Sequence, residues 1–322
     1  MTIVVSTKDQ DPRIAAVDEM AAAQIASDAK TGSFSVSSNT FTFFAAFDGT
    51  NNDKGDLGLS GTPQDTNVGM LYDQVNAILL AHPNIVAKYY AGLGTNGTLA
   101  GSSFLPDQVT LQAQITAEKA YRDFQSFAKD SLASNPKASI SIALTSFSRG
   151  DASAAIFSQL VYQNGVVDPS DPTHYYIQPG QVSFSGGVIF DPVTTGVAEN
   201  LAFAPNAKNL VAIVAANEYR TPFEGTDYTN DPGQFSTVQV LGNHVDIGGG
   251  YDNGIGAITL QAATEFFLKS GLPLASVASI DSRHGFNQGD VQTHEEDKIK
   301  GLPWPNYGVF FRARNSPYAS AA

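Results

Sequence analysis

The chain has 322 residues, of which 42% are hydrophobic and 15% charged, a composition typical of a globular protein with a sizeable core. Its 18 Lys and Arg against 31 Asp and Glu give a net charge of −13, which argues against nucleic acid as a partner and against electrostatic adhesion to anionic lipid. The absence of cysteine excludes disulfides and thiolate metal sites. The sequence shows neither a signal peptide nor an apolar run of the length of a membrane span, so we expect a protein made in the cytoplasm.

The hydrophobic periodicity predicts an alternation of helices and strands along the chain. Residues 11–30 are expected to form a helix, within an N-terminal helical appendage over residues 1–33. The pattern then predicts helices over residues 66–82 and 108–134, and strands over residues 41–47, 85–90, 140–147, 181–190, 209–216 and 237–241.

The predicted strands are continuous apolar runs, as in a parallel sheet that is covered by helices on both faces. We therefore predict an α/β fold with a mostly parallel sheet in one domain over residues 34–314. The final residues, 315–322, are small and polar and are expected to be a frayed tail.

The strand at residues 140–147 runs into Ser148 on a tight turn, and a helix of small residues follows. This is the local pattern of a nucleophile elbow, which exposes a serine hydroxyl to a base and backbone amides to an oxyanion. Small residues must flank the turn, and both Ser146 and Gly150 qualify, although Ser146 replaces the usual glycine. The alternative is that Ser148 is an ordinary helix N-cap.

In α/β hydrolases an acid and a histidine follow the serine in that order, and this chain supplies both. Asp191 closes the strand at residues 181–190, at the carboxyl edge of the sheet, where such folds place their sites. His244 follows the last predicted strand, in a glycine-rich loop at the same edge, and only His244 of the five histidines combines these features. Glu218 competes with Asp191 for the orienting role, the alternative being a structural pair of Glu218 with Arg220.

An oxyanion hole is expected to combine the backbone amide of Arg149 with an amide from Gly49 or Thr50, while Asp48 holds the turn that follows the first strand. No cofactor is predicted. Two acidic loops also permit a calcium site, but neither has an EF-hand spacing, and solvated carboxylates are the preferred interpretation. The residues concerned are Asp48, Asn52, Asp53 and Asp56 in one loop, and Asp246, Asp252 and Asn253 in the other.

Several widely separated motifs occur between about residues 41 and 272. In chain order they are Phe47-Asp48-Gly49-Thr50-x-Asn52, Thr66-Asn67-Val68, Tyr89-Tyr90-x-Gly92-x-Gly94-Thr95, Phe147-Ser148-Arg149-Gly150, Phe190-Asp191-Pro192-Val193, Asn217-Glu218-x-Arg220 and His244-x-Asp246-x-Gly248-Gly249-Gly250-Tyr251. In this order they resemble the uncharacterised-domain α/β hydrolases that include the first family of type VI secretion lipase effectors.

The resemblance implies a phospholipase-type serine esterase that a contractile secretion apparatus delivers into a competing bacterium. Carried over by motif, the nucleophile is Ser148, the orienting acid Asp191 and the base His244, with Asp246 and Glu218 in supporting positions. A phospholipid substrate, an immunity protein and a component of the secretion apparatus are the partners that it implies.

The chain departs from that family at the elbow, where Asp151 stands in place of the usual alanine and brings a charge beside the nucleophile. It is also shorter than many such effectors and shows no evident membrane-anchoring module. Two other functions stay open. One is an esterase for soluble or carbohydrate esters, which the polar segment at residues 164–179 favours weakly, and the other is a hydrolase fold without catalysis that serves as a binding or cargo module.

Overall fold

The computed structural model describes residues 12–34, 39–95, 106–168, 170–228, 233–251 and 254–275, together with three two-residue strands nearer the C-terminus. Its centre is a six-stranded sheet with the order β2-β1-β3-β6-β7-β9, and every neighbouring pair is parallel. This confirms the predicted α/β fold. The strands are β1 (Thr40–Phe47), β2 (Ile85–Tyr90), β3 (Ser139–Phe147), β6 (Ser183–Phe190), β7 (Leu210–Ala215) and β9 (Phe235–Val240).

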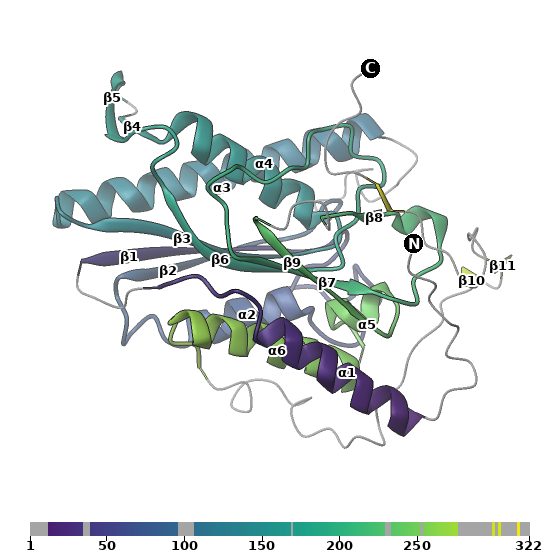
Figure 1. Cartoon of the computed structure of the whole chain (residues 1–322). Helices are drawn as coiled ribbons and strands as arrows, with labels where there is room; N and C mark the ends of the chain where they lie inside the picture. The colour runs from purple at the N-terminus through teal and green to yellow at the C-terminus, as the bar shows by residue number, and fades with distance from the viewer. Residues whose placement is uncertain are drawn as a thin grey trace.

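Helices cover both faces of this sheet (Figure 1). One face carries α3 (Pro106–Ser134) and α4 (Gly150–Asn164). The opposite face carries α1 (Pro12–Ser27), α2 (Asn67–Asn76), α5 (His244–Gly248) and α6 (Gly254–Ser270). Shorter elements complete the described fold: β4 (Val166–Asp168), β5 (Asp171–Ile177), η2 (Thr221–Phe223), β8 (Gly225–Thr226), β10 (Lys298–Ile299), β11 (Leu302–Pro303) and β12 (Arg314–Asn315).

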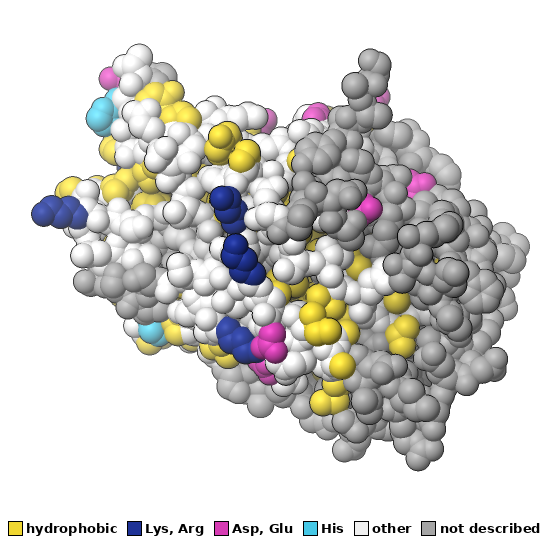
Figure 2. Space-filling view, in the orientation of Figure 1, with side chains coloured by type: hydrophobic (Ala, Val, Ile, Leu, Met, Phe, Trp, Pro, Cys, Tyr) yellow, Lys and Arg dark blue, Asp and Glu magenta, His cyan; other side chains and the backbone are white. Residues whose placement is uncertain are grey.

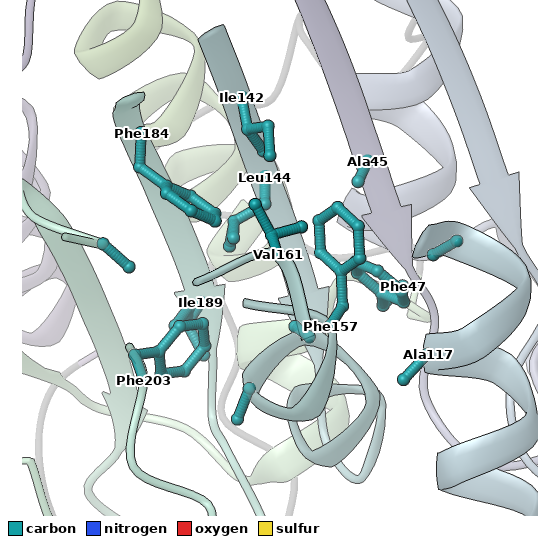
Figure 3. Close-up of a cluster of buried hydrophobic side chains, with 14 of the residues drawn as sticks. Ala45, Phe47, Ala117, Ile142, Leu144, Phe157, Val161, Phe184, Ile189 and Phe203 are labelled. Carbon is teal, nitrogen blue, oxygen red and sulfur yellow. The ribbon is translucent and has the colours of Figure 1, made fainter. Parts of the chain in front are cut away.

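Each face of the sheet has its own hydrophobic core. On the α3/α4 face, Phe157 of α4 packs between the side chains of β1 and α3, with its ring 5.7 Å from that of Phe47 and 6.3 Å from that of Phe124 (Figure 3). Burial of one such side chain contributes about 1.5–3 kcal/mol. Because side chains on both faces of the strands are buried, eight consecutive residues of β3 are inaccessible, and the strand shows no polar alternation.

The N-terminal helix α1 packs against α6 and β9. Its Ala26 is buried in the second core, and beyond the helix the amide of Phe34 donates to the carbonyl of Ser270 at 2.8 Å. The first residues of the predicted appendage and residues 316–322 of the predicted tail lie outside the described part of the chain, so these two boundaries stay predictions. No helix among the described residues is both long enough and apolar enough to cross a membrane.

Two predicted features differ from the structure. The helix expected over residues 66–82 ends at Asn76, because the chain tightens there into turns in which Ile78 donates to the carbonyl of Val75. The pattern also missed α6, whose residues are buried nearly all round. A helix without a polar face has no amphipathic period, and its sequence therefore lacks the signal on which such a prediction depends.

All six strands run in the same direction, so their carboxyl ends meet at one edge of the sheet. Asp48 follows β1, Ser148 follows β3 and Asp191 follows β6 at this edge. His244 begins α5, four residues beyond the end of β9. Residues from four distant parts of the chain are thereby gathered at the edge of an open parallel sheet, where α/β folds place their ligands.

Candidate active site

Ser148 occupies the sharp turn between β3 and α4, with φ of 56°. Left-handed backbone is uncommon for a residue other than glycine and costs on the order of 1–3 kcal/mol, so it persists only where the surroundings enforce it. Here the Ser148 amide donates to the carbonyl of Phe190 at 3.1 Å, and its carbonyl accepts from Val193 at 3.3 Å. Hydrogen bonds to Phe190 at the end of β6 and to Val193 just after it thus hold the turn, as a nucleophile elbow requires.

Gly150 lies where the first turn of α4 touches the end of β1. A Cβ atom at this position would lie 2.4 Å from the carbonyl oxygen of Asp48 and 2.6 Å from that of Phe47. Only glycine fits between these backbone atoms. The small residue that the elbow pattern requires after the serine therefore has a direct steric cause.

His244 and Asp191 are in contact at this edge of the sheet. The distance between His244 Nδ1 and Asp191 Oδ2 is 2.6 Å, and both side chains are buried. The second oxygen of Asp191 accepts from the amide of Ala215 at 2.7 Å. The imidazole packs against two rings, with centroid distances of 4.5 Å to Phe147 and 4.8 Å to Phe223. A histidine that is held in this way at Nδ1 presents Nε2 as a base.

The glycine-rich stretch around His244 predicts a loop, whereas in the structure His244 is the first residue of the short helix α5. Asn243 caps the helix: its side chain accepts from the amide of Asp246, and the Asp246 carboxylate accepts from the Asn243 amide, both at 2.9 Å. Asp246 thus supports the backbone that carries the imidazole. Of the following glycines, Gly249 ends the helix with φ of 88°, and Gly248 lies where a Cβ would be 2.2 Å from the ring of Phe147.

Glu218 forms a buried ion pair with Arg220. The Nη2 and Nε atoms of Arg220 lie 2.6 and 2.8 Å from the two carboxylate oxygens, a bidentate geometry. Glu218 Oε2 also accepts from the backbone amide of His244 at 3.2 Å. The carboxylate that contacts the imidazole ring is therefore that of Asp191, whereas Glu218 contacts the histidine backbone. Arg220 in turn lies 3.9 Å from the ring of Phe223, which packs on the imidazole.

Asp48 is buried at the end of β1 and accepts several hydrogen bonds. Its carboxylate accepts from Thr66 Oγ1 at 2.8 Å and from the Tyr89 hydroxyl at 2.6 Å. It also accepts from the backbone amide of Gly49 at 2.7 Å. Burial raises the pKa of Asp48 to about 6, against the effect of these bonds. This hydrogen bond corrects the predicted oxyanion hole. The Gly49 amide, predicted as a donor, is bound by the neighbouring carboxylate, so the Thr50 amide is the remaining predicted donor in this loop.

Asp151 lies in the first turn of α4 and is fully buried. Its carboxyl group accepts from the hydroxyl of Tyr228 at 2.6 Å and from that of Ser146 at 3.4 Å. Burial raises the pKa of Asp151 to about 7, although both hydrogen bonds act in the opposite direction. The carboxyl group of Asp151, which the sequence places near Ser148, is therefore turned into the protein, toward Tyr228.

The raised pKa of Asp151 predicts a specific dependence of stability on pH. Between its ordinary value of 3.8 and about 7, the folded state binds the proton more tightly than the unfolded state, so the free energy of unfolding decreases as pH rises through this window. Asp151→Asn cannot ionise and is expected to become more stable relative to the unmodified protein as pH rises from 4 to 8. Urea unfolding at several pH values measures the difference, and parallel stability curves for the two proteins would contradict the assignment.

The acidic loops that permitted a calcium site are occupied by local hydrogen bonds. Asp53 and Asp56 each accept from the amide of the glycine two residues later, at 2.8 and 3.1 Å. Asp252 and Asn253, in the second loop, lie outside the described residues. In the described ranges, no cluster of three or more histidine, aspartate or glutamate side chains is arranged to hold a metal ion.

No family model matches the chain, and no curated protein matches it. Among solved structures, an uncharacterized protein from Pseudomonas aeruginosa matches with 16% sequence identity over 84% of this chain and a TM-score of 0.50. This chain spans about half of that protein, 51% of its length. Esterase PE8 and an iodinated complex of acetyl xylan esterase also match, at 14% and 13% identity over 74% and 73% of this chain and 98% of each of theirs, with TM-scores of 0.36 and 0.33. At these identities the likeness concerns the fold alone, a parallel α/β sheet covered by helices on both faces.

Proposed function

We propose that this protein is a serine esterase that hydrolyses the acyl ester bonds of glycerophospholipids through an acyl-enzyme. The observation that carries the proposal is the 2.6 Å contact between His244 Nδ1 and Asp191 Oδ2, at the sheet edge where Ser148 is held on its left-handed turn. A hydroxyl, a base and an orienting carboxylate in this order and at this edge are what acyl transfer requires.

In the proposed reaction, His244 Nε2 takes the proton of Ser148 as Oγ attacks the ester carbonyl carbon. The negative charge that develops on the carbonyl oxygen is stabilised by the amide of Arg149 at the start of α4 and by the loop after β1. The imidazolium then protonates the departing alcohol, which leaves as a lysophospholipid. Water, deprotonated by the same histidine, attacks the acyl-enzyme, releases the fatty acid and restores Ser148.

A lipid substrate is supported by the apolar side chains near this edge. Leu57 and Leu59, in the loop that follows β1, are 38% and 42% exposed. The same loop reaches the segment after α5, where the amide of Gln64 donates to the carbonyl of Gly250 at 3.2 Å. The net charge of −13 gives no overall electrostatic attraction to anionic lipid, so we propose apolar contact as the attachment to a lipid surface. On the face shown in Figure 2, the described basic side chains form one short row with another apart from it.

The alternative of a soluble or carbohydrate ester drew on the polar segment at residues 164–179. In the structure this segment forms the β4–β5 hairpin beyond the C-terminal end of α4 (Figure 1). The 15 residues of α4 begin at the elbow, so the hairpin lies about 22 Å from Ser148 along the helix axis. A segment at this distance does not line the ester site, and it no longer favours the alternative.

Delivery into a competing bacterium by a type VI secretion apparatus, and an immunity protein in the producing cell, also belong to this proposal. The ordered motifs from Phe47 to Tyr251 support them. The chain that would be delivered spans about half of the P. aeruginosa protein whose fold it shares.

The test is fatty-acid release from mixed phosphatidylethanolamine and phosphatidylglycerol vesicles by the purified protein. Ser148→Ala is expected to reduce release by at least about 10³-fold, because the nucleophile is lost. Ser153→Ala is the matched control, since it removes the hydroxyl of another buried serine, in the first turns of the helix α4 that follows Ser148, and should leave release unchanged.

Three results would overturn parts of the proposal. Ser148-dependent cleavage of p-nitrophenyl butyrate without release from vesicles would replace lipid by a soluble ester. Equal activity of Ser148→Ala and the unmodified protein would exclude the serine mechanism. No hydrolysis and no labelling of Ser148 by a fluorophosphonate would leave a non-catalytic module.

A further inference from the structure

We propose that the side-chain hydroxyl of Thr50 is a catalytic donor of the oxyanion hole, in addition to the backbone amides of Thr50 and Arg149. The inference rests on the proposed serine esterase function and adds a residue to that site. It assigns chemistry to a side chain, whereas the sequence pattern pointed only to backbone amides.

The pairing of β1 with β3 brings Thr50 to the elbow. The two strands are parallel, and Phe47 pairs with Ser146, so continuation of this register places Gly49 level with Ser148. Neighbouring strands lie about 4.8 Å apart. The close approach of Gly150 to the carbonyl oxygens of β1 and Asp48 shows that the two turns remain in contact beyond the strand ends. Thr50 is the next residue along this loop.

In this loop, the backbone amides on either side of Thr50 already donate hydrogen bonds to other groups. The Gly49 amide donates to Asp48 Oδ1 at 2.7 Å, and the amide of Asn51 donates to the carbonyl of Leu93 at 2.9 Å. Thr50 Oγ1, by contrast, is buried and has no hydrogen-bond partner among the residues that the structure describes. A buried hydroxyl without a partner lowers stability, and a ligand that supplies the missing acceptor is one reason for a fold to retain it.

The position of Thr50 distinguishes it from the buried hydroxyls without a partner that lie inside helices and strands. Those of Thr145 and Thr237 lie within β3 and β9, among side chains of the covered sheet. Thr50 instead lies in the loop that abuts the elbow, at the edge where an ester carbonyl must approach Ser148. Because Thr50 Oγ1 is buried in the free protein, the side chain must rotate about its Cα–Cβ bond to donate to an oxygen there, and it gives up no existing hydrogen bond in doing so.

The loop is also fixed in a way that an oxyanion hole requires, because donors contribute most when they need no rearrangement during the reaction. Thr66 and Tyr89 donate to Asp48 on one side. On the other side Gly92 lies so close that a Cβ there would be 1.6 Å from the Gly49 carbonyl oxygen and 3.1 Å from the Thr50 amide nitrogen. The loop that carries Thr50 is therefore held through Asp48 by Thr66 and Tyr89, and through Gly49 and Thr50 by the segment that follows β2.

The test compares Thr50→Val, which keeps the shape but removes the hydroxyl, with Thr50→Ser, which keeps the hydroxyl. Loss of one oxyanion donor lowers kcat about 10²- to 10³-fold, so this loss is expected for Thr50→Val with KM for p-nitrophenyl butyrate little changed. Thr50→Ser should stay within about tenfold of the unmodified protein. Because the hydroxyl has no partner in the folded protein, Thr50→Val should unfold at the same or a higher temperature.

A trifluoromethyl ketone, which forms a charged tetrahedral adduct with the serine, supplies a second readout. Its affinity should fall for Thr50→Val in proportion to kcat/KM. Thr145→Val is the matched control, because it removes another buried hydroxyl without a partner and should leave kcat and inhibitor affinity unchanged.

Unchanged kcat in a folded Thr50→Val would overturn the inference while leaving the esterase function intact. If Thr50→Val does not fold, Thr50→Ala replaces it: retention of activity by serine and its loss by alanine supports the hydroxyl, and equal activity of the two overturns it. An unmodified protein without Ser148-dependent hydrolysis would overturn the proposed function itself, and this inference with it.

Discussion

Asp191→Asn is expected to lower kcat/KM for ester hydrolysis by about 10³- to 10⁴-fold while the protein stays folded. The hydrogen bonds around the carboxyl group explain the size of the effect. The Ala215 amide donates to Asp191 Oδ1, so an asparagine must keep its carbonyl oxygen there and turn its amide group toward His244 Nδ1. The imidazole then carries its proton on Nε2, where it cannot accept the proton of Ser148.

The measurement is the dependence of kcat/KM on pH with a soluble ester, alongside the unfolding temperature. Glu218→Gln is the comparison, because Glu218 contacts the backbone of His244 and the guanidinium of Arg220. It should lower stability, since a buried ion pair loses one charge, yet keep kcat/KM of the folded protein within about tenfold. Greater inactivation by Glu218→Gln than by Asp191→Asn would assign the orienting role to Glu218.

Gly150→Ala is expected to destabilise the protein by about 1–3 kcal/mol or more and to lower kcat/KM about 10²-fold. The new methyl group would lie 2.4 Å from the carbonyl oxygen of Asp48 and must push the elbow away from the loop after β1. Ser148, the Arg149 amide and the Thr50 donors would then no longer converge on one point.

Gly69→Ala tests whether this effect is steric. Gly69 also lies in the first turn of a helix, α2, but a Cβ there would have its nearest neighbours at 3.6 Å, an ordinary contact distance. Alanine favours the helix, so this variant should gain up to about 1 kcal/mol in the free energy of unfolding. Urea unfolding distinguishes the two, and a gain in stability for Gly150→Ala would contradict the close approach seen in the structure.

The sheet could be predicted from sequence because its strands are buried on both faces and appear as uninterrupted apolar runs. β2, for instance, has the bounds that the pattern predicts, Ile85–Tyr90. The helix α6 could not, since burial on nearly all sides removes its period. The sequence did not predict the α5 helix, because the pattern assigns its glycines to a loop. In the structure, Gly249 ends the helix and Gly248 makes room for the ring of Phe147.

For the candidate site, strand ends and chain order predicted Ser148, Asp191 and His244, and the structure places all three at one edge of the sheet. Contacts between distant segments could not be predicted from the sequence. The burial of Asp151 depends on Tyr228, which is 77 residues away and belongs to no motif. Likewise, the hydrogen bond from the Gly49 amide to the Asp48 carboxylate depends on the rotamer of the Asp48 side chain. Thr66 and Tyr89 stand in the ordered motifs, and the structure adds the reason: both bind that carboxylate.

The strand order β2-β1-β3-β6-β7-β9 has a consequence for how this protein acquires activity during folding. Parallel strands pair only after long crossovers have closed, so contacts of high sequence separation form late and slowly. Asp48, Ser148, Asp191 and His244 come from segments that meet only when β1, β3, β6 and β9 share one sheet. A chain that has collapsed but has not completed its sheet is therefore inert, and the onset of ester hydrolysis during refolding would mark the moment at which the last strand joins.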